Sequence, residues 1–320
     1  MPSGFVTIAR KEFIDTLRSK RFLIIIILFV AVLAFSSAGV SMAGSLVPGF
    51  VPRRFFGRLG MSLSSSMGFI VPILGIALGY AAISGERESG SLKLMLARPI
   101  HREDVITGKA IAAIVAAGIA MLSSTLIAVG GGVWLQGVTP TFDDVTRLMV
   151  FTLISMILFA AYYAICLFFS TLFTKTSRSL LVAIFVWVFF SFIIPIAASL
   201  VAMITIGAPP VRIFEPGVNA TQPGMNVTQT IMGQEFQEYS RRVAAISGSI
   251  QSFSINSHYS TVANAVLVAE SEIGGQPGTS RSITIAEALT THWTSLVVLV
   301  TFTVIFLVAS YLAFTRREER

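Results

Sequence analysis

The chain has 320 residues, of which 54% are hydrophobic and only 12% are charged, and its formal net charge is +7. A soluble domain usually carries about 25% charged residues, so this composition argues against disordered proteins, secreted enzymes and nucleic-acid-binding proteins. In a membrane protein, an excess of Lys and Arg is typical of the cytoplasmic loops. Cys166 is the single cysteine, which excludes an internal disulfide.

The first predicted element is an amphipathic helix over residues 5–20. Its polar face includes Lys11 and Arg18. Its apolar face is made of Phe5, Ala9, Phe13, Thr16 and Leu17. Such a helix lies in the membrane interface with its cations near the lipid phosphates. The alternative is a solvated segment that leads into the first membrane span.

Six segments then reach the roughly 20 apolar residues that a membrane-spanning helix needs. They are residues 22–43, 62–84, 105–133, 148–173, 180–206 and 293–314. Lys109 is the only Asp, Glu, Lys or Arg inside these boundaries. Ion-coupled transporters usually carry ionisable residues at membrane depth, so we expect the energy for this protein to arrive from outside the bilayer.

Small residues and prolines inside the spans predict how the helices pack and bend. The pair Gly75 and Gly79, and the series Ala112, Ala116 and Ala120, form faces that allow two helices to approach closely. Packing within one subunit explains such faces, and a subunit interface is the alternative. Pro72 and Pro195 are predicted to kink the second and fifth spans.

The distribution of basic residues predicts the orientation. With six spans both termini lie on one side, and that side carries 15 Lys and Arg, whereas the other carries 8. The side with 15 is expected to be cytoplasmic. The sequence thus predicts a multi-pass protein of the cell membrane with both termini in the cytoplasm.

Residues 207–292 form the one sizeable predicted extracytoplasmic region. One stripe at helical spacing holds Met232, Phe236, Tyr239, Val243 and Ile246. A second holds Ile255, Tyr259, Val262, Val266 and Ala269, and Gly248 separates the two. We predict a helical hairpin whose stripes bury each other and which acts as a lid or docking platform.

The predicted fold is therefore an all-α integral membrane protein with six transmembrane helices, an N-terminal interfacial helix and the extracytoplasmic hairpin between spans five and six. Its predicted parts are the interfacial helix at 1–21, spans one to five at 22–206 with a cytoplasmic loop at 85–104, the outer region at 207–292, and the sixth span and tail at 293–320.

Motifs for chemistry are lacking. Gly85 and Gly90 have the glycine spacing of a phosphate-binding loop, but Ser91 and Leu92 replace its Lys and hydroxyl residue. The three histidines have no metal-ligand spacing. We therefore expect that the chain is not an enzyme, that it does not hydrolyse ATP itself, and that it holds no metal or cofactor of its own.

Two stretches of the chain resemble permease subunits of ABC transporters of the type-2 exporter class. The first is residues 9–13 and 17–22, which run into span one; the second is residues 83–93, then 96–100, then Gly108-Lys109. In that family an acidic residue precedes Gly-(Thr/Ser)-Leu, a Pro follows, and Gly-Lys opens the next span. Glu86 and Gly90 fit this pattern. Permeases of nitrous-oxide-reductase maturation and of gliding machinery are among the relatives that the resemblance suggests.

The resemblance implies an elbow helix at the N-terminus and, within residues 85–98, a coupling helix that docks on a separate ATPase. It also implies a permease dimer with two ATPase subunits, which bind ATP and Mg. The coupling residues are then Glu86, Gly90, Leu92, Lys93, Met95, Leu96, Arg98 and Pro99. Leu92, Met95 and Leu96 offer apolar knobs with charged rims, although a solvated loop resting on lipid is the alternative.

Two residue roles follow from chemistry. Gly90 is expected to allow a sharp bend or a close backbone approach. Glu86 is expected to hold a basic partner, either near Arg87 or at Lys109, through charge-assisted hydrogen bonds. Outside the membrane, Arg53, Arg54 and Arg58 depart from the charge rule and are candidates for contact with an anionic ligand or lipid, with a plain solvated loop as the alternative.

The leading functional hypothesis is an ATP-driven permease that exports an amphipathic or hydrophobic substrate. The alternative is a permease that passes ATP-driven motion to an extracytoplasmic accessory protein. Membrane lipid is expected as a further partner, and nucleic acid is not.

Overall fold

A computed structural model describes residues 4–46, 55–92, 102–136, 140–207, 226–267, 270–272 and 280–316. The chain divides into two compact units. The first unit comprises residues 1–187 and 258–320, and the second comprises residues 188–257. Because the two units are separate bodies, each is considered by itself.

Helices make up nearly all of the described chain, as predicted. They are α1 (Gly4–Arg18), α2 (Lys20–Leu46), α3 (Phe55–Gly79), α4 (Ser84–Glu88), α6 (Arg102–Gln136), α7 (Phe142–Leu172), α8 (Thr176–Val188), the π-helical turn η2 (Phe189–Ile193), α9 (Ile194–Ile206), α10 (Asn226–Gln251), α11 (Ile255–Leu267), α12 (Ile285–Thr291) and α13 (Trp293–Thr315). One departure is a small antiparallel ribbon, in which β1 (Glu270–Glu272) pairs with β2 (Ser280–Ser282).

Five helical segments of the described chain are long and apolar enough to cross a membrane. They are Leu59–Glu88, Glu103–Gly131, Phe142–Leu172, Thr176–Ile206 and Trp293–Thr315. They correspond to five of the six predicted spans. A sixth is present if Phe5–Arg18 and Phe22–Ser36, which are bent by 63°, are counted as one span. The chain is thus a multi-pass helical membrane protein, while the number six remains a prediction.

Helix α7 is the centre of the first unit. Thr141 and Asp144 form a capping box at its start, in which each side chain accepts a hydrogen bond from the other residue's backbone N–H. Helices α3 and α13 pack along α7, and α2 packs on α3 and α6. Aromatic and small apolar residues of α7 are buried in these contacts. Dispersion contacts between closely packed side chains stabilise such helix pairs in a membrane.

The predicted small-residue faces pack helices within this chain. A Cβ atom added at Gly75 would lie 3.0 Å from Cβ of Tyr162, and one added at Gly79 would lie 2.6 Å from Cβ of Cys166. Larger residues would therefore push α3 away from α7. Ala116 on α6 is also fully buried. The interpretation of these faces as intramolecular packing is confirmed for Gly75 and Gly79.

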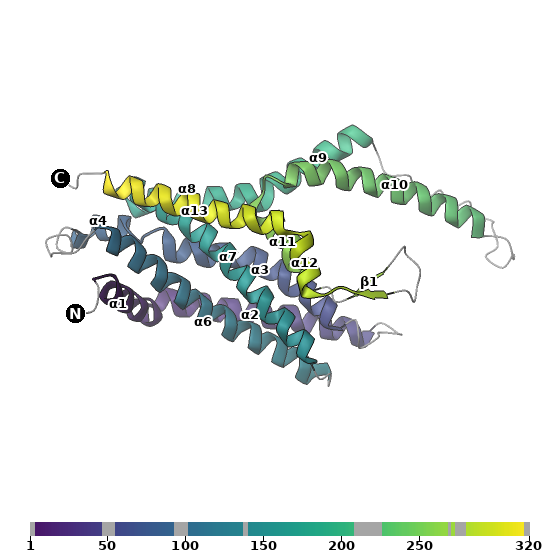
Figure 1. The fold of residues 1–320 in the computed structure, drawn as a ribbon, viewed down its shortest axis with the longest axis horizontal. Helices are drawn as coiled ribbons and strands as arrows, with labels where there is room; N and C mark the ends of the chain where they lie inside the picture. Colours follow the sequence, from purple (N-terminus) through teal and green to yellow (C-terminus); the bar gives the residue numbers. More distant parts are fainter. Residues whose placement is uncertain are drawn as a thin grey trace. The chain divides into compact units, whose positions relative to one another are not determined.

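Figure 1 shows that α1, α4 and the C-terminal end of α13 lie at one end of the first unit, which we call the junction end. Helices α11 and α12 lie at the opposite end, which we call the far end. The candidate site described below is built at the junction end.

The second unit contains η2, α9 and α10. The π-helical turn ends at Ile193, two residues before Pro195, whose missing N–H cannot donate to an α-helical carbonyl. The helix is therefore irregular next to Pro195, where the sequence predicts a kink. Helix α10 packs on α9, and the Tyr239 hydroxyl donates a hydrogen bond of 3.2 Å to the carbonyl of Gly207. Helix α10 continues through Gly248 to Gln251, so the predicted break at Gly248 is wrong.

The pairing of the two stripes as a hairpin is not confirmed. Tyr239, Val243 and Ile246 of α10 are half-buried where α10 meets α9. In the second stripe, Ile255, Tyr259, Val262 and Val266 are fully buried, and Ala269 lies outside the described residues. Tyr259 contacts α3 and α7: a Cβ atom at Gly68 would lie 3.3 Å from its ring, and its hydroxyl lies 2.9 Å from Ser155 Oγ.

Candidate functional site

Residues 83–92 form a tightly bent segment at the junction end. Helix α4 is one turn long, and Gly90 follows it with φ of +75°. This left-handed conformation favours glycine, and a Cβ atom at Gly90 would meet nothing within 4 Å. The bend predicted for Gly90 is therefore present, and the alternative, a close backbone approach, stays a prediction. The chain is helical again at Ser91 and Leu92.

A buried lysine between two carboxylates is the main electrostatic feature of this end. Lys109 on α6 is 5% exposed, and its Nζ lies 2.7 Å from Glu86 Oε1 and 3.0 Å from Glu12 Oε1. These ion pairs join α4 and α1 to the start of α6. Lys109 was one of the two partners predicted for Glu86, and the structure shows this contact.

A second cation borders the cluster, since Lys11 Nζ lies 3.6 Å from Glu12 Oε1. Glu86 and Glu12 are 17% and 19% exposed at their side chains, so water screens them little. Glu86 Oε2 is buried and accepts no hydrogen bond from the described chain. Because a buried charge is stabilised by its partners, Glu86 depends on the ammonium of Lys109, whereas Glu12 is shared between Lys109 and the exposed Lys11.

Helix α1 is present where the sequence predicts it, and one of its faces packs on α6. Ile8 is the most buried of its described residues, and a Cβ atom at Gly108 would lie 2.9 Å from Ile8 Cγ2. Glu12 lies one turn further along the same face and reaches Lys109. In the predicted apolar face, Phe5 is exposed and the other four residues are half-buried, so the placement of this face in the membrane interface stays a prediction. Glu12 is not among the predicted site residues, because its place beside Lys109 depends on how α1 packs on α6.

The same segment is also bound to the end of α7. Ser170 Oγ accepts hydrogen bonds from the backbone N–H groups of Ile83, at 3.0 Å, and Ser84, at 2.9 Å. The guanidinium of Arg87 donates to the carbonyls of Thr171 and Phe173. The last carbonyls of a helix lack intrahelical donors, so Arg87 caps α7.

Glu88 makes the connection to α8. Its Oε2 accepts hydrogen bonds from the Thr176 hydroxyl, at 2.7 Å, and from the Thr176 backbone N–H, at 3.0 Å. Thr176 is the first residue of α8, where backbone donors are unpaired. The hydroxyl bond, then the backbone bond and the charge of Lys175, hold the pKa of Glu88 below its usual value.

We predict that this cap responds to acid. Since the pKa of Glu88 is lower in the folded protein, the cap stabilises the start of α8 above the ordinary carboxyl range and is lost as the pH falls through the lowered pKa. Hydrogen-exchange protection of the Thr176 amide, corrected for intrinsic rates, is expected to fall between about pH 5 and about pH 3.

The control for this prediction is Glu88→Gln, which keeps an acceptor but does not titrate in this range. Protection of the Thr176 amide in that variant is expected to be lower at neutral pH and independent of pH. An equal loss of protection in acid for both proteins would contradict the assignment to Glu88.

The other predicted coupling residues are only partly described. Leu92 is 1% exposed, so its side chain packs within this chain, and its predicted part in docking stays a prediction. Lys93, Met95, Leu96, Arg98 and Pro99 lie outside the described residues. So do Arg53 and Arg54, while Arg58 lies in α3. The predicted anionic contact of these three arginines remains a prediction.

A second buried cation lies at the far end. Arg147 of α7 is 5% exposed and donates from Nε to Asp143, at 2.6 Å. Its other two nitrogens donate to the carbonyls of Val266, at 2.9 Å, and Ile283, at 2.6 Å. Val266 is in the last turn of α11, and Ile283 precedes α12. Arg147 therefore fixes both far-end helices to α7.

Small residues on α3 make room for α11. A Cβ atom at Gly60 would lie 2.9 Å from Cβ of Leu267, and Gly68 faces Tyr259. Ser64, which lies between these glycines at the same helical spacing, is 1% exposed. Gly60-x-x-x-Ser64-x-x-x-Gly68 is the sequence signal for this face, and the sequence analysis missed it.

The described residues contain no cluster of three or more His, Cys, Asp or Glu side chains that would hold a metal ion. The polar groups of the junction end are engaged in ion pairs and helix caps. These contacts link α1, α4, α6, α7 and α8 to one another.

Comparisons with known proteins agree with the resemblance. A family model described as ABC-2 family transporter protein matches residues 6–319. A probable ABC transporter permease protein NosY of Pseudomonas aeruginosa is 36% identical over 124 residues, which are 39% of this chain and 42% of that protein. The protein of the same name from Stutzerimonas stutzeri is 37% identical over 133 residues, 38% of this chain and 46% of that protein. Each match spans less than half of the relative.

Proposed function

The chain belongs to the ABC-2 family of transporter proteins and is a transporter membrane subunit, and from this premise we propose that a separate ATPase docks on residues 85–98 and drives it. Two ATPase subunits, which bind ATP and Mg, serve a dimer of this permease. The basic-residue count supports an orientation with the junction end and both termini in the cytoplasm.

The observation that carries this proposal is the convergence of contacts on residues 83–90. Within these eight residues, Ser84 and Arg87 bind α7. Glu86 binds α6, and Glu88 binds α8. Through Lys109 the same segment also reaches Glu12 of α1. A force applied to this segment therefore acts on four helices without passing through a loop.

The exposed residues beside these contacts supply the docking surface. Glu88, Ser89, Gly90 and Ser91 are exposed, whereas Ile83, Ser84 and Leu92 on either side are buried. A short exposed segment that is already held in one conformation loses less conformational entropy when a partner binds it. In this arrangement Leu92 anchors the segment in the permease, and the ATPase contacts Ser89 to Ser91 and the residues that follow them.

For the substrate, we propose an amphipathic or hydrophobic molecule that is moved outward. Within the predicted span boundaries, Lys109 is the only charged residue, and it is paired, which favours an apolar translocation path. The alternative is transmission of motion to an extracytoplasmic partner. The contacts of Arg147 support this alternative. They connect α11 and α12 directly to α7, and Arg87 binds the other end of α7.

Site-specific photocrosslinking tests the docking proposal. A benzophenone amino acid is placed at Ser89 or Ser91 in the full chain, which is co-expressed with a candidate ABC ATPase subunit. Crosslinks from both positions to the ATPase are expected. Benzophenone at the exposed far-end residues Phe142 and Thr290 serves as the matched control and is expected to give no crosslink.

Crosslinks to the ATPase from Phe142 or Thr290 would reverse the proposed orientation. An ATPase that co-purifies with the chain but does not crosslink to Ser89 or Ser91 would place the docking surface elsewhere. Stimulation of ATP hydrolysis by amphiphiles, measured on the same complex, separates transport from transmission of motion.

A further inference from the structure

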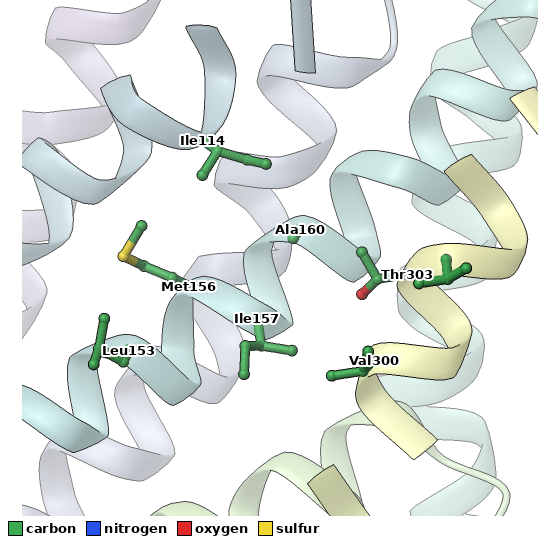
Figure 2. Close-up of a pocket in the computed structure, with 8 residues that line it drawn as sticks. Ile114, Leu153, Met156, Ile157, Ala160, Val300 and Thr303 are labelled. Atoms are coloured by element: carbon green, nitrogen blue, oxygen red, sulfur yellow. The ribbon is translucent and has the colours of Figure 1, made fainter. Parts of the chain in front are cut away.

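An apolar groove of about 400 Å³ runs between three of the helices that are long enough to cross a membrane. Its floor is one face of α7, made of Leu153, Met156, Ile157 and Ala160. Ile114 of α6 forms one wall, and Val300, Thr303 and Val304 of α13 form the other. Figure 2 shows these side chains arranged around an open space.

The groove exists because of particular side chains. Ala160 is small and leaves room on the floor where a larger residue would fill the gap between α7 and α13. The side chain of Met156 extends towards α6, where a Cβ atom added at Gly118 would lie 2.9 Å from its Cε. The flexible thioether of methionine adapts its shape to whatever lies beside it.

The side chains that line the groove offer no free hydrogen-bonding group to a polar ligand. Thr303 has the only side-chain hydroxyl among the lining residues, and it donates to the carbonyl of Leu299 at 2.9 Å. A water molecule needs at least two polar partners to be held in a cavity, and this groove offers none that are unpaired. The occupant is therefore a hydrocarbon.

The position of the groove identifies the source of that hydrocarbon. Ile157 is the middle residue of α7, and Val304 is the middle residue of α13. The middle of a membrane-spanning helix lies at the centre of the hydrocarbon layer. Val300 and Val304 are 45% and 51% exposed, and Val115 of α6 beside the opposite wall is 46% exposed, so the groove opens towards that layer.

We propose that this groove is a binding site for one acyl chain of a membrane lipid, held at the level of its terminal half. The chain contacts α7, α6 and α13 at once, so it makes more dispersion contacts than a chain against a convex helix face and exchanges more slowly. The site is independent of the ATPase docking and of the transported substrate.

Photolabelling of the full chain in phosphatidylcholine vesicles tests this proposal. A fraction of the phosphatidylcholine carries a diazirine near the end of one acyl chain, and labelled peptides are identified by mass spectrometry. Residues 153–160 and 300–304 are expected to be labelled about tenfold more than Val308, which is 50% exposed on the same helix outside the groove.

Two substitutions fill the groove from different sides. Ala160→Phe fills the floor, and Val304→Trp fills the space from an exposed position that tolerates bulk. Each is expected to lower labelling of residues 153–157 about tenfold, because the acyl chain loses contact with the floor. Val308→Trp, the matched control, is expected to leave that labelling unchanged. If Ala160→Phe does not fold, Val304→Trp alone decides the outcome.

Equal labelling of the groove and of Val308, or labelling that persists in both filled variants, would overturn the proposal. A disulfide between two protomers through Ile157→Cys would also overturn it, because a second copy would then cover the groove. Displacement of the label by a transported amphiphile would assign the groove to the substrate instead of to a bilayer lipid.

Discussion

Lys109→Met is expected to lower the free energy of unfolding by about 3–5 kcal/mol and to abolish ATP hydrolysis that depends on the permease. The reason is that Glu86 and Glu12 share this ammonium and are less than one-fifth exposed. Within the described chain, Glu86 would be left without an ion-pair partner, and Glu12 would keep only the exposed Lys11 at 3.6 Å. Thermal unfolding of the purified chain and ATPase activity of the complex measure the two effects.

The controls separate charge from connection. Lys109→Arg retains the positive charge and is expected to keep most of the stability. The triple variant Lys109→Met, Glu12→Gln and Glu86→Gln removes the uncompensated charges and is expected to regain stability, but not coupled hydrolysis, since the ion pairs between α1, α4 and α6 are absent. If Lys109→Met changes neither the stability nor the hydrolysis, the ion pairs neither stabilise the junction end nor couple α4 to α6 and α1.

Arg147→Ala is expected to detach α11 and α12 from α7. The substitution leaves the carbonyls of Val266 and Ile283 without donors, at a cost of about 1–3 kcal/mol for each buried group that stays unpaired. Hydrogen exchange of residues 258–267 is expected to increase, while exchange at the junction end is expected to remain as it is. Mass spectrometry of backbone deuterium uptake in the full chain measures both.

The chain offers a matched control for this prediction. Arg242 of α10 also pairs with an acidic residue four positions earlier, Glu238, but both side chains are 65% exposed. Because water screens such a pair, Arg242→Ala is expected to cost no more than about 0.5 kcal/mol. Similar effects of Arg242→Ala and Arg147→Ala would indicate that the contacts of Arg147 with the two carbonyls contribute nothing to holding α11.

The sequence by itself determined the class of the protein and most of its membrane helices. Long apolar segments without charge have one stable environment, so composition alone locates them. The single exception, Lys109, was visible for the same reason: a cation within a span must find a carboxylate, and Glu86 was a candidate because of its place in the motif. Gly75 and Gly79 likewise predicted a close helix contact that the structure confirms.

Only the tertiary structure decided which surfaces meet. Periodicity shows that a helix has an apolar face, but it does not identify the partner of that face, because dispersion contacts are non-directional. The stripe of α11 was therefore assigned to α10, whereas Gly60 and Gly68 of α3 provide the surface that receives it. For the same reason Leu92 could not be recognised as buried, and Glu12 could not be recognised as the second partner of Lys109, until α1 and α6 were seen side by side.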